Sequence, residues 1–148
     1  MSMLLTVSCD VHDKKRDGFY ENVLYIKDNN LYLWMDKGVK IDHLEEGSYI
    51  WDIYETANGS RIFYSIVDIE TKQTTLKYYN IPSSGKHSGV VADNIRYFKV
   101  CEKGDLVYYE MEDSDVYFTY LKENVKVSSE AYLQCMSNDG KYIIFNLS

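Results

Sequence analysis

The chain has 148 residues, of which 45% are hydrophobic and 15% aromatic, and it contains 15 tyrosines but a single proline. This length is sufficient for one domain with a buried core, and the aromatic content favours strands because such side chains fit a pleated surface. A formal net charge of −7 repels phosphate backbones and anionic lipids. Nucleic acids and membranes are therefore excluded as expected partners.

The first candidate element is the apolar segment from Leu4 to Cys9. It is too short for a secretory leader and lacks a basic start, so we expect a strand there. The compartment stays open: we expect a cytoplasmic location for the chain as it stands, and an extracellular one if it is a fragment of a secreted or anchored protein. Cys9, Cys101 and Cys135 are far apart and odd in number, which predicts reduced, buried and inert thiols.

Three later segments each combine a glycine turn with an apolar strand. The turns are Asn58-Gly59, Lys103-Gly104 and Asp139-Gly140, and the strands after them are Arg61–Ser65, Leu106–Glu110 and Tyr142–Asn146. Asn-Gly and Asp-Gly pairs supply the positive φ values that tight hairpins need. The glycines recur at intervals of about 40 residues, the period expected for a four-stranded blade of a β-propeller.

A second feature recurs in the same order along the chain. Leu31–Trp34, Lys37-Gly38 and Val39–Ile41 are matched by Val116–Thr119, Lys122–Asn124 and Val125–Val127, and the first copy follows an apolar strand at Asn22–Ile26. Together these features predict a unit of four antiparallel strands, A to D, with the glycine turn between A and B. The units run over about residues 4–43, 48–93 and 95–131, and residues 132–147 hold only strands A and B.

Large apolar side chains occupy consecutive positions in the B strands. In Val107–Tyr109 and Tyr142–Phe145 both faces of the strand are apolar, so we expect both faces to be buried. A sheet stacked between two neighbouring sheets has this property. The sequence therefore predicts an all-β fold of antiparallel four-strand repeats, one domain over residues 1–148 with about three and a half β-propeller-like blades. A β-sandwich or an open barrel is the alternative.

The most specific motif is Met136–Phe145. Over Ser137–Phe145 it resembles the Ser-Pro-Asp-Gly-Lys-x-Ile-x-Phe signature of the TolB-type, WD40-like propeller repeat, with Asn138 in place of the proline. The copies at Gly59 and Gly104 keep the glycine and the apolar strand but lack the Ser-Pro-Asp. The resemblance implies a structural turn within a blade and a role in protein binding or as an accessory domain. It implies no catalytic residue.

The half unit at the end leaves strand edges without partners, a feature that proteins usually cover. Two copies of about three and a half blades would together complete one ring of about seven, within the range of closed propellers. We therefore expect a protein partner, which is either a second copy in a homodimer or another protein. The rival interpretations are a piece of a longer propeller and a curved open array with shielded edges.

Binding residues are expected where the A strands line a central channel or its rim. Asp10 and Asp52 are the acids nearest to such a channel, and Trp51 and Tyr54 are aromatic residues on the same strand as Asp52. The acids within Glu110–Asp115 are expected to be solvated, because they span a hairpin turn. The sequence contains no catalytic triad pattern, phosphate loop or metal-binding motif, so no catalytic residue, metal or cofactor is predicted.

Three functions follow from these patterns. A non-catalytic binding or assembly module predicts oligomerisation, and it uses the features that the sequence visibly has. A carbohydrate-binding propeller, with a small sugar as ligand, predicts an exposed pair of aromatic side chains flanked by polar groups. A fragment of a propeller hydrolase predicts two carboxylates facing one another across a pocket, at roughly 5 to 10 Å.

Overall fold

The computed structural model describes residues 23–34, 37–81 and 88–147. Within these ranges the chain forms thirteen strands and no helix, which confirms the prediction of an all-β chain. Consequently, no membrane-spanning helix is found in the described part of the chain. The expected first strand, Cys9 and the candidate binding residue Asp10 lie outside the described residues.

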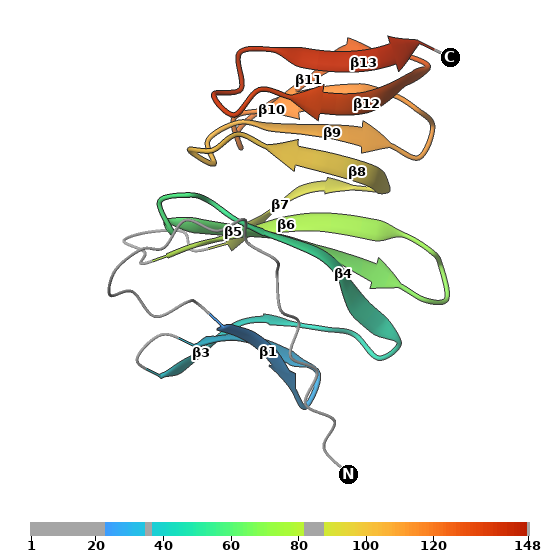
Figure 1. Ribbon diagram of the computed structural model, residues 1–148. Helices are drawn as coiled ribbons and strands as arrows, with labels where there is room; N and C mark the ends of the chain where they lie inside the picture. Colours follow the sequence, from blue (N-terminus) through green and yellow to red (C-terminus); the bar gives the residue numbers. More distant parts are fainter. Residues whose placement is uncertain (1–22, 35–36, 82–87, 148) are drawn as a thin grey trace. The chain divides into compact units, whose positions relative to one another are not determined.

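The chain divides into two compact units, residues 1–48 and 49–148. The described part of the first unit is an antiparallel sheet in the order β1-β2-β3 (Figure 1). Its strands are β1 (Val23–Lys27), β2 (Asn30–Trp34) and β3 (Gly38–His43). Asp28 and Asn29 join β1 to β2 with φ angles of 50° and 57°, as in a two-residue hairpin turn. Leu31 and Leu33 are its most deeply buried side chains.

The second unit contains three antiparallel sheets, in which each strand pairs with the next one along the chain (Figure 1). The first sheet consists of β4 (Ser48–Glu55), β5 (Arg61–Asp68), β6 (Thr74–Asn80) and β7 (Ser88–Asp93). The second consists of β8 (Ile95–Val100), β9 (Val107–Met111), β10 (Val116–Thr119) and β11 (Asn124–Ser128). The third consists of β12 (Ala131–Met136) and β13 (Ile143–Leu147). Among the described residues, no sheet closes on itself.

The core of the second unit is built by residues of its first two sheets. Strand β8 packs against β6, and β12 packs against β8, β9 and β10, so successive sheets are in direct contact. Strand β5 is the most buried element, since Ile62–Ser65 are each no more than 1% exposed. The central cluster consists of Phe63, Leu76, Val91, Ile95, Phe98, Val100, Val107 and Tyr109.

The three glycine turns of this unit share one hydrogen-bond pattern. In each turn the glycine N–H donates to the carbonyl of the residue three positions earlier, whose own N–H donates to the carbonyl five positions after it. The turn glycines have φ angles between 65° and 73°, which residues with a Cβ adopt only at a cost. The glycine pairs are Gly59 with Thr56, Gly104 with Cys101 and Gly140 with Ser137.

Neighbouring turns are joined to each other by equivalent hydrogen bonds. The Ala57 N–H donates to the Glu102 carbonyl at 3.3 Å, and the Glu102 N–H donates to the Asn138 carbonyl at 2.7 Å. Each of these three residues lies two positions before its turn glycine. The turns also approach closely, because a methyl group on Gly104 would overlap the side chain of Thr56. The same contact therefore recurs from one sheet to the next.

Candidate functional site

Apolar side chains are exposed on β13 and in the turn that precedes it. Tyr142 is 72% exposed, Ile144 59% and Leu147 72%. Counted from the turn glycine, the residue of β5 that corresponds to Ile144 is Phe63, which is fully buried. The expectation that Tyr142–Phe145 is buried on both faces is therefore wrong in the described structure. Its physical cause is that no further sheet of the described chain covers β13.

The sheet that contains β13 is also incomplete at its edge. Strand β9 pairs with β8 on one side and β10 on the other, and β5 likewise lies between β4 and β6. Strand β13 pairs only with β12 among the described strands. In the described structure, one edge of β13 therefore presents backbone N–H and C=O groups, which are a template for pairing with another strand. We call the exposed face and edge of β12 and β13 the terminal sheet surface.

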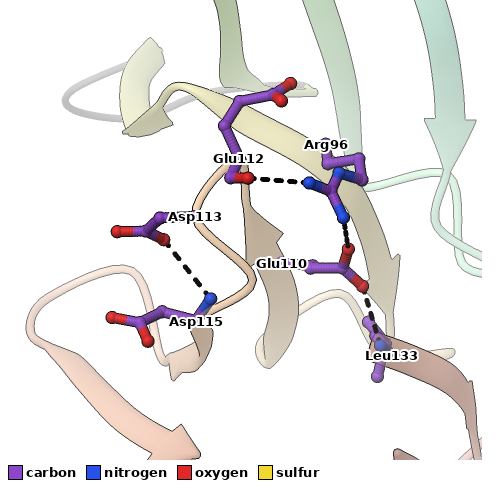
Figure 2. Close-up of polar contacts among 6 residues, drawn as sticks. All are labelled: Arg96, Glu110, Glu112, Asp113, Asp115 and Leu133. Atoms are coloured by element: carbon purple, nitrogen blue, oxygen red, sulfur yellow. Dashed lines mark hydrogen bonds and ion pairs between the residues drawn. The ribbon is translucent and has the colours of Figure 1, made fainter. Parts of the chain in front are cut away.

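A buried carboxylate connects the terminal sheet to the sheet before it (Figure 2). Glu110 in β9 is 3% exposed, and its Oε1 lies 3.0 Å from Nη1 of Arg96 in β8. Its Oε2 accepts a hydrogen bond from the Leu133 N–H in β12 at 2.8 Å. The Arg96 guanidinium also donates to the Glu112 carbonyl at 2.7 Å and lies 5.6 Å from the Tyr132 ring centroid. Three strands are thus held by one carboxylate.

The expectation of solvated acids is wrong for Glu110. The residue belongs to β9 and not to the following turn, and it points toward Arg96 and Leu133 (Figure 2). Such a charge is tolerated because both carboxylate oxygens have partners. Asp115 is also engaged, since its Oδ2 is 2.5 Å from Nζ of Lys126. That contact lowers the pKa of Asp115, chiefly through the hydrogen bond from Lys126.

An open cleft of about 230 Å³ lies in the second unit between residues of β4 and β8. Trp51 is 68% exposed, and its ring centroid lies 6.3 Å from that of Tyr49 with the ring planes inclined by 60°. The neighbouring Asp52 N–H donates to Ser65 Oγ at 3.1 Å, which ties this part of β4 to β5. The cleft, called the Trp51 cleft below, is lined by Tyr49, Trp51, Asp52, Arg96, Tyr97 and Glu112 together with five further residues.

The structure brings two of the candidate binding residues together. Trp51 and Asp52 both line the Trp51 cleft. Tyr54 does not line it, because its side chain is half-buried against the central core cluster. Burial raises the pKa of the Tyr54 phenol, and the nearby Cys101 and Glu102 add to this effect. Asp10 lies outside the described residues.

Sequence reasoning missed Arg96 and Glu112 as neighbours of Trp51. A register shift between Ile95 and Tyr97 marks a bulge at Arg96, and such a bulge changes the direction of a side chain without a clear signature in the sequence. The one available signal is that Arg96 interrupts an apolar strand, which points to a pairing role. Glu112 was expected to be an ordinary solvated acid, and its place beside β4 depends on long-range packing.

The thiols give no metal site in the described part of the chain. Cys101 is buried and its Sγ donates to Asp105 Oδ1 at 2.9 Å, a hydrogen bond that lowers the pKa of Asp105. Cys135 is exposed, so the expectation of a buried thiol is wrong for this residue. It lies on the terminal sheet, which lacks the cover that the inner sheets have. No group of three or more metal-ligating side chains is found among the described residues.

Comparison with protein-family models gives no match, and a search of curated proteins gives no similar sequence.

Proposed function

We propose that the chain is a non-catalytic, β-propeller-like assembly module that completes a ring of sheets with a second copy of itself. The observation that carries this proposal is the exposure of β13, whose counterparts β5 and β9 are largely buried. Apolar burial stabilises by about 25 cal/mol per Å². Tyr142, Ile144 and Leu147 therefore provide a driving force for association at the terminal sheet surface.

A sheet from a second copy of this chain suits the terminal sheet surface, because the hydrogen bonds between successive glycine turns repeat along the chain. Ala57 and Glu102 each donate their N–H to the next turn along the chain. The N–H of Asn138 is the equivalent donor of the third turn, and it has no partner among the described residues. A turn of the same type in a second copy would present a carbonyl in the required position.

The open edge of β13 supports the same interpretation. In each inner sheet the equivalent strand is paired on both sides, and backbone pairing is an effective way to add a strand to an open edge. The residues along β13 are mostly apolar, and no proline or lysine within Ile143–Leu147 discourages pairing. A second copy would therefore satisfy the face and the edge together.

The resemblance of Ser137–Phe145 to the propeller repeat motif supports a blade-like role for this sheet. Ser137 Oγ donates to Asp139 Oδ1 at 2.7 Å, and the same oxygen accepts the Lys141 N–H at 3.1 Å. These bonds stabilise the turn that leads into β13. Side-chain hydrogen bonds around an Asp-Gly pair are what a structural turn within a blade requires.

Light scattering coupled to size exclusion over a concentration series tests the proposal. We expect a mass of about twice 17.3 kDa for the unaltered chain and a monomer for Ile144→Lys, because the lysine places a charge in the apolar interface. The matched control is Ile69→Lys, since Ile69 is a 49% exposed isoleucine in the turn after β5. This control should keep the mass of the dimer.

Two outcomes would contradict the proposal. One is a monodisperse monomer at all concentrations, which would leave the terminal sheet surface to a different protein. The other is an equal loss of the dimer in Ile144→Lys and Ile69→Lys, which would show that association does not depend on β13.

A further inference from the structure

We propose that the Trp51 cleft binds an organic cation that carries an ammonium or guanidinium group, such as a basic side chain. This inference is independent of the proposed assembly, because Trp51 lies on β4 and not on the terminal sheet. It assigns a ligand class to two of the candidate binding residues, Trp51 and Asp52. The carbohydrate alternative predicts a neutral ligand for the same exposed aromatic pair.

The aromatic wall of the cleft is open to a ligand. Trp51 is 68% exposed and Tyr49 38% exposed, and their rings are inclined by 60° at a centroid separation of 6.3 Å. Indole is the best side-chain partner for a cation over its ring face, and phenol rings also contribute. The two rings contact one another edge to face, and we expect the cation to lie over the exposed indole of Trp51 with Tyr49 beside it.

The cationic side chain that lines the cleft, Arg96, is already paired. Arg96 Nη1 donates to Glu110, and Nη2 donates to the Glu112 carbonyl. The charge of Arg96 is therefore balanced by a buried carboxylate, and two of its nitrogens are occupied. Other N–H donors of Arg96 remain, but Glu110 already balances its charge, so the cleft offers a phosphate or carboxylate no unbalanced positive charge.

The remaining charged groups of the cleft are acceptors. Asp52 uses Oδ1 to accept the Ile53 N–H at 2.8 Å, and its other oxygen has no partner among the described residues. The Glu112 carboxylate likewise has no partner in the described part of the chain, since only its backbone carbonyl contacts Arg96 (Figure 2). Two carboxylates beside an aromatic pair favour a ligand that has donors and positive charge.

The open cleft surrounds only one small group of a ligand. A volume of about 230 Å³ is below the range of about 300–1,000 Å³ that drug-sized ligands occupy. It suits a single ammonium or guanidinium group with part of its aliphatic stem, which packs against the ring edges.

Titration of the full chain by nitrogen-15 NMR tests this inference, because its two tryptophans give separate indole reporters. Trp34 is the internal control, since it is 50% exposed on β2 and remote in sequence from the cleft residues. The probes are choline, Nα-acetyl-lysine amide and neutral N-acetylglucosamine at low salt. We expect the two cations to shift the Trp51 indole resonance saturably, with little change at Trp34 and none with the sugar.

Matched variants distinguish specific binding of the cation at the Trp51 cleft from weak binding to any exposed aromatic ring. Trp51→Ala should weaken the binding of the better cation by about tenfold or more, whereas Trp34→Ala leaves it unchanged. Asp52→Asn combined with Glu112→Gln should weaken it by about tenfold, because both attractive charges are lost while the shapes are kept. The mass from light scattering should be the same in all these variants, which distinguishes this inference from the assembly proposal.

The proposal is overturned if the neutral sugar shifts the Trp51 resonance as strongly as the cations do. It is equally overturned if the cations shift the Trp34 resonance as strongly as that of Trp51. Unchanged affinity of the Asp52→Asn, Glu112→Gln double variant for choline and Nα-acetyl-lysine amide would also overturn it. If choline binds with higher affinity than Nα-acetyl-lysine amide, the ligand is a quaternary ammonium group. If the lysine amide binds with higher affinity, the ligand is a basic side chain.

Discussion

Strands β9 and β13 have the same place in their repeats but different surroundings. Each follows a glycine turn with the same backbone hydrogen bonds and carries consecutive large side chains. Val107 and Tyr109 are at most 2% exposed in β9, whereas their counterparts in β13, counted from the turn glycine, are only partly buried. These counterparts are Ile143 and Phe145, and Ile144 between them is 59% exposed. The local pattern therefore specifies strand and turn, and burial depends on whether a further sheet lies alongside.

The largest expected difference concerns the side chains four positions after the turn glycine. Phe63→Ala should lower the free energy of unfolding by about 3–5 kcal/mol, because it leaves a cavity in the core. Ile144→Ala should change it by less than about 0.5 kcal/mol in the monomer, as expected for an exposed site. Urea unfolding of both variants at low protein concentration measures the two values, and equal losses would contradict the comparison.

A second difference concerns the turn glycines. Gly104→Ala should destabilise the fold by about 3 kcal/mol, because it adds a clash with Thr56 to the cost of positive φ. Gly47 has a φ of 82° and no atom within 4 Å of an added Cβ. Gly47→Ala should therefore cost only about 1 kcal/mol. Thermal unfolding of the two variants compares them, and a smaller loss for Gly104→Ala would show that the turns do not interlock.

A third prediction addresses the bond between the last two sheets. Glu110→Ala should lower the free energy of unfolding by about 2 kcal/mol, because it leaves the Leu133 N–H without its acceptor and Arg96 without its carboxylate partner. Glu112→Ala is the control and should be nearly neutral, since its contact to Arg96 uses the backbone. Hydrogen exchange at β12 should rise selectively in Glu110→Ala. Unchanged exchange there would contradict the role of this carboxylate.

The smallest expected effect is the pH response of one turn. Hydrogen bonds from Ser137 and Lys141 lower the pKa of Asp139 to about 2. Because the folded-state pKa is depressed, this stabilisation is present above the unfolded pKa of about 4 and is lost as the pH falls toward 2. Asn58, the equivalent residue of the β4–β5 turn, does not titrate. NMR titration of both turns checks this, and a normal midpoint for Asp139 would contradict it.

The sequence predicts the strands and turns of this molecule better than its long-range contacts. Gly59, Gly104 and Gly140 mark the hairpins because positive φ has a strong local signature. The contacts of the buried Glu110 with Arg96 and Leu133 could not be predicted, because they depend on a β-bulge and on the approach of β12. The same limit explains why Trp51 and Asp52 were found as candidates without their neighbours across the cleft.

The exposure of β13 also marks a limit of sequence reasoning. Consecutive apolar residues in Tyr142–Phe145 predict two buried faces, and nothing in these residues says which chain provides the cover. Within the second unit, the β4–β7 sheet packs against β8 and the β8–β11 sheet packs against β12, whereas the terminal sheet surface is open in the described structure. When no described part of the chain covers such an apolar strand, the pattern predicts that another chain does.

The most direct test of this account is hydrogen exchange of the β13 amides measured as a function of protein concentration, with the β9 amides as the internal reference. If a second copy docks on the terminal sheet surface, the β13 amides should become markedly more protected at high concentration, while those of β9 stay protected throughout. Fast exchange of β13 at every concentration would contradict the account, because it would mean that no second copy covers this strand.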